Sequence, residues 1–209
     1  MPEPAGPGAE ATPEPDRVGP IVLVGLMGSG KTTVGKKLAR LVGHRFVDAD
    51  VELEARTGRS VADWFLDGEA AFRAQEEQLL AALLAEPEPL VVGAGGGVVV
   101  SERNRARLRA PGVTVVYLHA EPAFLASRAQ ARPHRPLLTG DPVEVLGRMY
   151  GERDPWYREV ADTVVEVRPA HEAGEKPKWR LAEQVAEALV DLGRLAADQV
   201  ATPAQVRQP

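Results

Sequence analysis

Short apolar runs alternate with longer segments of helical periodicity along the middle of the chain. Most of the runs are rich in valine and nearly continuous, which is typical of strands that are covered on both faces of a sheet. Strands that alternate with helices predict a parallel, right-handed, doubly wound sheet, and therefore an α/β fold. The predicted strands are 20–26, 44–48, 89–94, 112–119 and 162–167.

The helical segments lie between and after these strands. The predicted helices are 31–42, 60–65, 69–85, 101–110, 122–129, 142–160 and 179–192. Ser60, which opens "SVADWF", is expected to cap its helix. The segment 131–142, "ARPHRPLLTGDP", joins two helices and contains three prolines, a glycine and two arginines. A loop of this composition is predicted to act as a mobile lid.

The two ends of the chain differ from the centre. Residues 1–17 are rich in Pro, Ala, Glu and Gly and carry almost no large apolar side chain. Such a segment cannot offset its ordering entropy by burial, so we expect a disordered tail. The sequence 198–209 has a similar composition and gives the same expectation. One domain is therefore predicted over 18–197.

Composition narrows the class of protein. The chain has 209 residues, enough for one ordinary α/β domain, and 44% of them are hydrophobic. The charge of 25 − 30 = −5 gives no basic footprint for nucleic acid. Cysteine is absent, which excludes disulfides and thiolate metal sites. No apolar run approaches the ~18 residues of a membrane span, and the N-terminus lacks the pattern of a signal peptide. We expect a cytoplasmic protein without a nucleic-acid or membrane partner.

The strongest motif is "GLMGSGKT" at 25–32, which fits the pattern G-x-x-x-x-G-K-[ST] between a strand and an amphipathic helix. Gly25, Gly28 and Gly30 can adopt positive φ and turn backbone N–H groups toward phosphate oxygens. The following helix adds its positive N-terminal dipole. Lys31 can reach the β- and γ-phosphates, and Thr32 can ligate Mg²⁺. A glycine turn with a solvated lysine is the alternative, but the strand and helix context favours a phosphate-binding loop.

Two sequence motifs are missing, and their absence argues against two classes of P-loop protein, the switch GTPases and the typical ATPases. A switch GTPase needs an Asn-Lys-x-Asp sequence, whereas the single asparagine, Asn104, is followed by arginine. The strand 89–94 runs into glycines, as "PLVVGAGGG", and lacks the acidic residue at the strand end of a typical ATPase. Asp48 and Asp50, in "DAD" after the second strand, are the available replacement. Alternation along an extended segment would point both toward the ligand-binding edge of the sheet. Capping of the following helix remains the alternative.

Six blocks together resemble the successive blocks of the shikimate kinase family: "LVGLMGSGKTTVGKKLA", "FVDADVELEARTGRSVADWF", "GEAAFRAQEE", "GAGGGVV", "RPLL" and "RDPWYREVAD". They occur in the family's order from residue 18 to about residue 167. The first block is shared by many kinases, but the combination is specific. The resemblance implies a three-layer P-loop fold with five parallel strands in the order 2-3-1-4-5. It also implies ATP, Mg²⁺ and phosphorylation of the 3-hydroxyl of shikimate, and we expect a monomer.

The resemblance also implies roles at the nucleotide and the metal. Asp50 would orient the reacting hydroxyl and accept its proton, and Asp48 would hold Mg²⁺ through water, with Thr32 as the hydroxyl ligand. Positioning and charge neutralisation would do most of the catalysis. The residues expected at ATP are Gly28, Ser29, Gly30, Lys31, Thr32, Thr33, Arg128 along the adenine and Arg135 of "RPLL" over the phosphates. Of these Lys31 and Arg135 join Asp50 as catalytic residues, although both arginines could instead be ordinary loop residues.

For the substrate, the resemblance makes Arg73 the partner of the shikimate carboxylate, because a guanidinium binds carboxylate bidentately. Glu76 would orient Arg73. The alternative for Arg73 is a surface ion pair with Glu69 or Glu77, each four residues away. The other expected substrate residues are Gly95, Gly96 and Gly97, where bare backbone permits close approach, and Arg153 as a second carboxylate arginine. A plain turn and a solvated helix arginine are the respective alternatives.

Two other functions compete with this prediction. Another small-molecule kinase of the same scaffold, such as a gluconate kinase, would share the phosphate loop and the Asp-x-Asp pair. It would not be expected to combine "GAGGG", "FRxxE" and "RDPWY". A nucleotide-binding subunit without turnover would be expected to lack Lys31, Asp50 or the lid arginine. After the fifth strand, "VRPAHEAGEKPKWR" offers no clear counterpart of the family's adenine contact, and we assign none.

Overall fold

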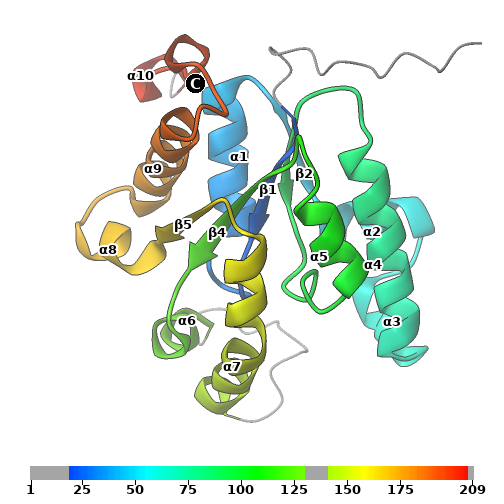
Figure 1. The fold of residues 1–209 in the computed structure, drawn as a ribbon. Coiled ribbons are helices and arrows are strands. Elements are labelled where there is room, and N and C mark those ends of the chain that lie inside the picture. The colour runs from blue at the N-terminus through cyan, green and yellow to red at the C-terminus, as the bar shows by residue number, and fades with distance from the viewer. Residues whose placement is uncertain (1–18, 130–140, 207–209) are drawn as a thin grey trace, which may run out of the picture.

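The computed structural model describes residues 19–129 and 141–206. A five-stranded parallel sheet forms the centre of the molecule, with the strand order β2-β3-β1-β4-β5 (Figure 1). The strands are β1 (Ile21–Val24), β2 (Arg45–Asp48), β3 (Leu90–Gly93), β4 (Thr114–His119) and β5 (Thr163–Glu166). Every residue of β1, β3 and β4 is buried, as continuous apolar strands require. The predicted fold class and strand order are confirmed.

Helices cover both faces of this sheet. Right-handed crossovers place α1 (Lys31–Val42) on the face opposite to α4 (Glu69–Leu84), α5 (Glu102–Leu108) and α7 (Pro142–Val160) (Figure 1). The C-terminal helix α9 (Pro177–Asp191) packs beside α1. Helix α6 (Pro122–Ala129) follows β4 and packs against α7. The carboxyl ends of the strands and the helix N-termini that follow them meet at one edge, where ligands bind in such sheets.

Two short helices, α2 (Ala49–Thr57) and α3 (Val61–Leu66), lie between β2 and α4. Ser60 caps α3: its side chain accepts a hydrogen bond from the N–H of Asp63, and the Asp63 carboxylate accepts from the N–H of Ser60. This reciprocal pair is the capping box, and it confirms the predicted role of Ser60. Helix α2 was not among the predicted elements. Only Leu53 of α2 is buried, so its sequence carries little helical periodicity.

The C-terminal segment departs from the prediction of disorder from residue 198. A 3₁₀ turn (Ala197–Gln199) and helix α10 (Pro203–Val206) are formed there. The N–H of Ala201 donates to the carbonyl of Leu41 at 2.7 Å, which satisfies a carbonyl at the end of α1. Val200 and Val206 pack against the core. The prediction of a disordered tail is therefore wrong for 198–206. This segment contacts the end of α1 and the core, and its composition does not reveal these contacts.

Some predicted features fall where the structure gives no description. The expected tail 1–17, the lid loop over 131–140 and residues 207–209 lie outside the described residues. Helix α8 (Val167–Glu172), which directly follows β5, was not predicted, and it takes Val167 from the end of the expected strand. Over the described ranges, none of the helices is long and apolar enough to cross a membrane.

Candidate active site

The phosphate loop, residues 25–32, connects β1 to α1 with the backbone predicted from its glycines. The φ angles of Gly25, Gly28 and Gly30 are 140°, 89° and 104°, in the region that L side chains rarely adopt. A Cβ atom on Gly25 would also lie 2.7 Å from the carbonyl oxygen of Leu118 in β4. These two constraints explain why glycine is required. Ser29 is buried within the loop, and its Oγ has no hydrogen-bond partner in the described part of the chain.

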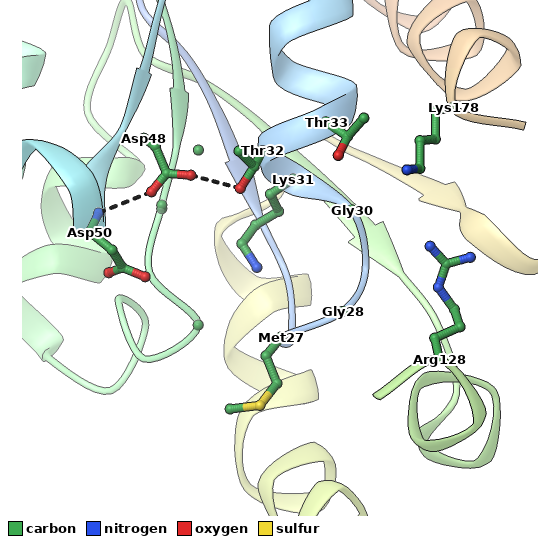
Figure 2. A pocket seen from close by; sticks show the side chains of 13 residues that line it. Met27, Gly28, Gly30, Lys31, Thr32, Thr33, Asp48, Asp50, Arg128 and Lys178 are labelled. Carbon is green, nitrogen blue, oxygen red and sulfur yellow. Dashed lines mark hydrogen bonds between the residues drawn. The ribbon is translucent and has the colours of Figure 1, made fainter. Parts of the chain in front are cut away.

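Lys31 opens helix α1 and reaches back across this loop. Its Nζ donates to the carbonyl oxygens of Gly25 at 2.7 Å and Leu26 at 3.1 Å. In Figure 2 Asp48 lies on one side of Lys31, and Arg128 and Lys178 lie on the other. All four surround a cavity of about 330 Å³. The cavity lining comprises Met27, Gly28, Gly30, Lys31, Thr32, Thr33, Asp48, Asp50, Gly93, Ala94, Gly96, Arg128 and Lys178.

Asp48 joins the end of β2 to the start of α1. Its Oδ2 accepts a 2.6 Å hydrogen bond from the Thr32 hydroxyl (Figure 2). Its Oδ1 accepts from the backbone N–H groups of Asp50 and Val51 at 3.2 and 3.5 Å, which caps helix α2. Both interpretations of Asp48 therefore hold: it is a helix cap, and it faces the cavity. A carboxylate beside a hydroxyl offers the hard oxygen ligands that Mg²⁺ prefers, so these residues fit the expected cation.

Asp50 faces the same cavity, but the element that carries it differs from the predicted one. It lies in the first turn of α2 rather than on an extended segment, so strand alternation does not explain why it faces the cavity with Asp48. Burial raises the pKa of Asp50, and the neighbouring Asp48 carboxylate raises it further. Lys31 and Arg73 act in the opposite direction, but the net shift of the pKa is upward. A carboxyl group of this kind suits proton transfer nearer neutral pH.

Arg73, on α4, is held by two carboxylates. Its Nη1 donates to Glu76 Oε2 at 2.7 Å, while Nη2 and Nε donate to Glu69 Oε1 at 2.9 and 3.2 Å. Glu77 instead accepts from the Ser101 hydroxyl at 2.6 Å. The alternative ion pair with Glu69 is therefore present together with the expected contact to Glu76. The Arg73 side chain is only 15% exposed, so this is not an ordinary surface pair.

The glycine turn, residues 95–97, follows β3 and lies against these side chains. A Cβ atom on Gly95 would lie 2.7 Å from Glu76 Oε1 and 3.2 Å from Asp50 Oδ1. A Cβ atom on Gly97 would overlap the Arg73 guanidinium. The missing side chains are therefore what allows Asp50, Arg73 and Glu76 to converge. Burial raises the pKa of Glu76, and its Oε1 has no hydrogen-bond partner among the residues described.

Arg153 reaches the same turn from helix α7. Its Nη1 donates to the carbonyl of Gly96 at 3.0 Å, and the hydroxyl of Tyr157 donates to the same oxygen at 2.5 Å. Sequence reasoning assigned Arg153 but missed Tyr157. The signal was available, because Tyr157 lies in the same "RDPWYREV" block, four residues and one helical turn after Arg153.

The far side of the cavity carries Arg128, on α6, and Lys178, in the first turn of α9. Arg128 lies over the ring of Phe124, with 5.5 Å between guanidinium carbon and ring centroid, and contacts His171 at 2.8 Å. Lys178 was not predicted; it belongs to the segment after the fifth strand, in which no nucleotide contact could be assigned. Two cations here give the cavity a positive end. The remaining predicted residue, Arg135, lies outside the described residues.

Comparison with known proteins identifies the family. The family model described as shikimate kinase matches residues 27–192. The shikimate kinases of Paramagnetospirillum magneticum and Aromatoleum aromaticum are 49% and 50% identical over 148 residues, which cover 70% of this chain and 74% and 83% of those proteins. The solved shikimate kinase of Acinetobacter baumannii in complex with shikimate is 34% identical, with a TM-score of 0.75 over 84% of this chain and 94% of that one. The chain belongs to the shikimate kinase family.

Proposed function

We propose that this protein transfers the γ-phosphoryl group of ATP to the 3-hydroxyl of shikimate. The observation that carries the proposal is the convergence of two sets of residues at Asp50. On one side Asp50 shares a cavity with the phosphate loop, and on the other it lies against the Arg73–Glu76 pair through the glycine turn. The bound shikimate named for the 34% identical Acinetobacter baumannii structure supports the choice of acceptor.

ATP would occupy the cavity with its phosphates on the phosphate loop. The loop N–H groups and the N-terminus of α1 stabilise the anionic phosphates. Lys31 would exchange its contacts with the Gly25 and Leu26 carbonyls for the β- and γ-phosphates. Arg128 and Lys178 border the other end of the cavity, where the base and ribose would lie. We keep Arg135 as the residue that closes over the phosphates, which excludes water from the γ-phosphoryl group.

Shikimate would lie between Asp50 and the glycine turn. Its carboxylate would accept hydrogen bonds from the guanidinium groups of Arg73 and Arg153. Glu76 orients Arg73 for this contact. Its 3-hydroxyl would donate a hydrogen bond to Asp50. As the oxygen attacks the γ-phosphorus, its proton passes to Asp50, and ADP leaves on the opposite side. The raised pKa of Asp50 brings it closer to the working pH of such a base.

A magnesium ion is the cofactor that this site fits. Thr32 Oγ1 and Asp48 Oδ2 would hold it, Asp48 through water. Phosphate oxygens of ATP and waters would supply the other ligands. When bound, Mg²⁺ neutralises charge that develops on the β- and γ-phosphates.

We further propose that the protein acts as a cytoplasmic monomer. The absence of cysteine is compatible with a reducing compartment.

The proposal is tested by measuring ADP release from Mg-ATP with shikimate, gluconate, AMP or no acceptor. We expect turnover with shikimate alone, and its loss in the Asp50→Ala variant. Turnover with gluconate or AMP instead would agree with the fold assignment but would reject shikimate as the acceptor. If a folded protein binds ATP but turns over none of these acceptors, it is a nucleotide-binding subunit and the proposal is wrong.

A further inference from the structure

Two side chains of helix α7 converge on one backbone oxygen. The hydroxyl of Tyr157 donates to the Gly96 carbonyl at 2.5 Å, and Arg153 Nη1 donates to the same oxygen at 3.0 Å. Tyr157 is fully buried, so water cannot replace either bond without cost. Burial also raises the pKa of Tyr157, so its hydroxyl remains a donor throughout the physiological range.

Gly96 lies between helix α7 and the phosphate loop. A Cβ atom added to Gly96 would lie 3.6 Å from the N atom of Met27 and 3.8 Å from the carbonyl oxygen of Gly25. The residue also lines the cavity. The turn is thus hydrogen-bonded to α7 on one side and lies close to the phosphate loop. Without side chains of their own, its glycines depend on such contacts to hold one conformation.

The direction of the Gly96 carbonyl decides the direction of the next N–H group. A trans peptide is planar, and its C=O and N–H point to opposite sides. A carbonyl held against α7 therefore directs the N–H of Gly97 away from α7. Gly97 is the residue that lies against the Arg73 guanidinium, so the orientation of this peptide affects the pocket proposed for the acceptor carboxylate.

The bond from Tyr157 has a second effect, on Arg153. With Tyr157 Oη on the carbonyl, Arg153 shares the acceptor and does not have to satisfy the buried oxygen alone. Its Nε has no hydrogen-bond partner within the described residues, so the guanidinium retains donor capacity. Arg153 can then turn donors toward an anionic ligand without leaving Gly96 O unpaired.

We propose that Tyr157 is a positioning residue for the acceptor: its hydroxyl fixes the Gly96 peptide and leaves Arg153 available for the substrate carboxylate. This inference rests on the proposed function, since it names a further determinant of shikimate binding in the same site. It differs from a general structural role in one respect. Loss of the hydroxyl weakens binding of the acceptor and leaves binding of the nucleotide unchanged.

The chain offers a matched control for this proposal. Tyr117 stacks on Tyr157 with 4.9 Å between ring centroids, and it is 1% exposed. Its hydroxyl donates to Asp154 Oδ1 at 2.9 Å, on the same helix but not on the glycine turn. Tyr157→Phe and Tyr117→Phe each keep the stacked rings and each remove one buried hydrogen bond. They differ in whether that bond reaches Gly96.

The experiment is steady-state kinetics of wild type and both variants, with shikimate and ATP varied separately and thermal midpoints recorded. For Tyr157→Phe we expect the KM for shikimate to rise about tenfold, as for one lost buried hydrogen bond. Its KM for ATP should stay within about twofold and its kcat within about threefold of wild type. Tyr117→Phe should leave both KM values within about twofold of wild type, with a similar loss of thermal midpoint.

Three outcomes would overturn the inference: an unchanged KM for shikimate in Tyr157→Phe, an equal rise in the KM for ATP, or the same rise in Tyr117→Phe. Wild-type turnover reports on the proposed function separately, because inactivity of wild type with shikimate rejects that function before the variants are compared. A cycle with Arg153→Lys is a second measurement. Since both residues share one acceptor, the two changes should be non-additive, and strict additivity would contradict the proposal.

Discussion

The hydroxyl of Thr32 and the carboxylate of Asp48 lie 2.6 Å apart and join the first turn of α1 to the end of β2. The two residues are 16 positions apart in sequence, and the parallel sheet brings them together at its carboxyl edge. This contact connects the phosphate loop to helix α2, whose cap is the same Asp48 and whose first turn holds Asp50. One side chain therefore takes part in the metal site, the helix and the placement of the proposed base.

The two roles of Asp48 can be separated by substitution. Asn is as good an N-cap as Asp, whereas Ala loses the cap at a cost of about 1 kcal/mol. We expect Asp48→Asn to retain the thermal midpoint but to need about tenfold more Mg²⁺ for half-maximal activity, because a neutral amide is a weaker ligand. Titration of activity with Mg²⁺ and a melting curve measure both effects. An unchanged requirement for Mg²⁺ would contradict the assignment of Asp48 to the metal.

Asp50→Asn tests the proton acceptor without removing the shape of the side chain. We expect kcat to fall by about 10²–10⁴, the usual contribution of a general base, while the KM for shikimate changes by less than about fivefold. Steady-state kinetics separate the two constants. A variant with kcat near that of wild type and a much higher KM would assign Asp50 to substrate binding alone.

Gly97→Ala tests the close packing of the glycine turn on Arg73. The added Cβ would overlap the guanidinium, so Arg73 must move and the KM for shikimate should rise by about tenfold or more. Gly151→Ala is the matched control, because its Cβ would have nothing within 4 Å and α7 should gain roughly 0.5–1 kcal/mol of stability. If Gly97→Ala binds shikimate as tightly as Gly151→Ala does, Arg73 is not the carboxylate partner.

His171 predicts a pH dependence of stability. Burial, with Arg128 and Lys178 nearby, lowers the pKa of His171 below the ordinary histidine value of about 6.5. Above about pH 6.5 the histidine is neutral in both states, so its titration does not change the free energy of unfolding. Below that pH the unfolded state binds the proton more readily than the folded state, so the free energy of unfolding falls. Wild type should therefore lose more stability between pH 8 and pH 5.5 than His171→Gln does. Urea unfolding at both pH values measures this, and an equal loss in the two proteins would refute it.

Structural features were predicted correctly from the sequence where local conformational preferences agree with the tertiary structure. The three glycines of the phosphate loop were predicted to adopt positive φ, and all three do. Valine-rich runs became parallel strands in the order that the family resemblance implied, and β1, β3 and β4 are fully buried. Helix α2 could not be found in this way, since Leu53 is its single buried residue and leaves almost no periodic pattern.

Other features depend on contacts that no local pattern shows. Glu69 and Glu77 are both four residues from Arg73, but Glu77 is held by Ser101 and Arg103, and Glu69 forms the pair. The ordered segment 198–206 depends on the carbonyl of Leu41, far away in sequence. Lys178 reaches the cavity because α9 packs against α1, which requires the assembled sheet.

The identity of the product tests the central claim most directly. Wild type and Asp50→Ala are incubated with ATP, Mg²⁺ and shikimate, and the product is examined by phosphorus–proton correlation NMR. We predict a phosphate ester coupled to the ring proton at C3 with wild type, formed in step with ADP, and none with Asp50→Ala. Release of inorganic phosphate alone, or an ester at another hydroxyl, would contradict the account.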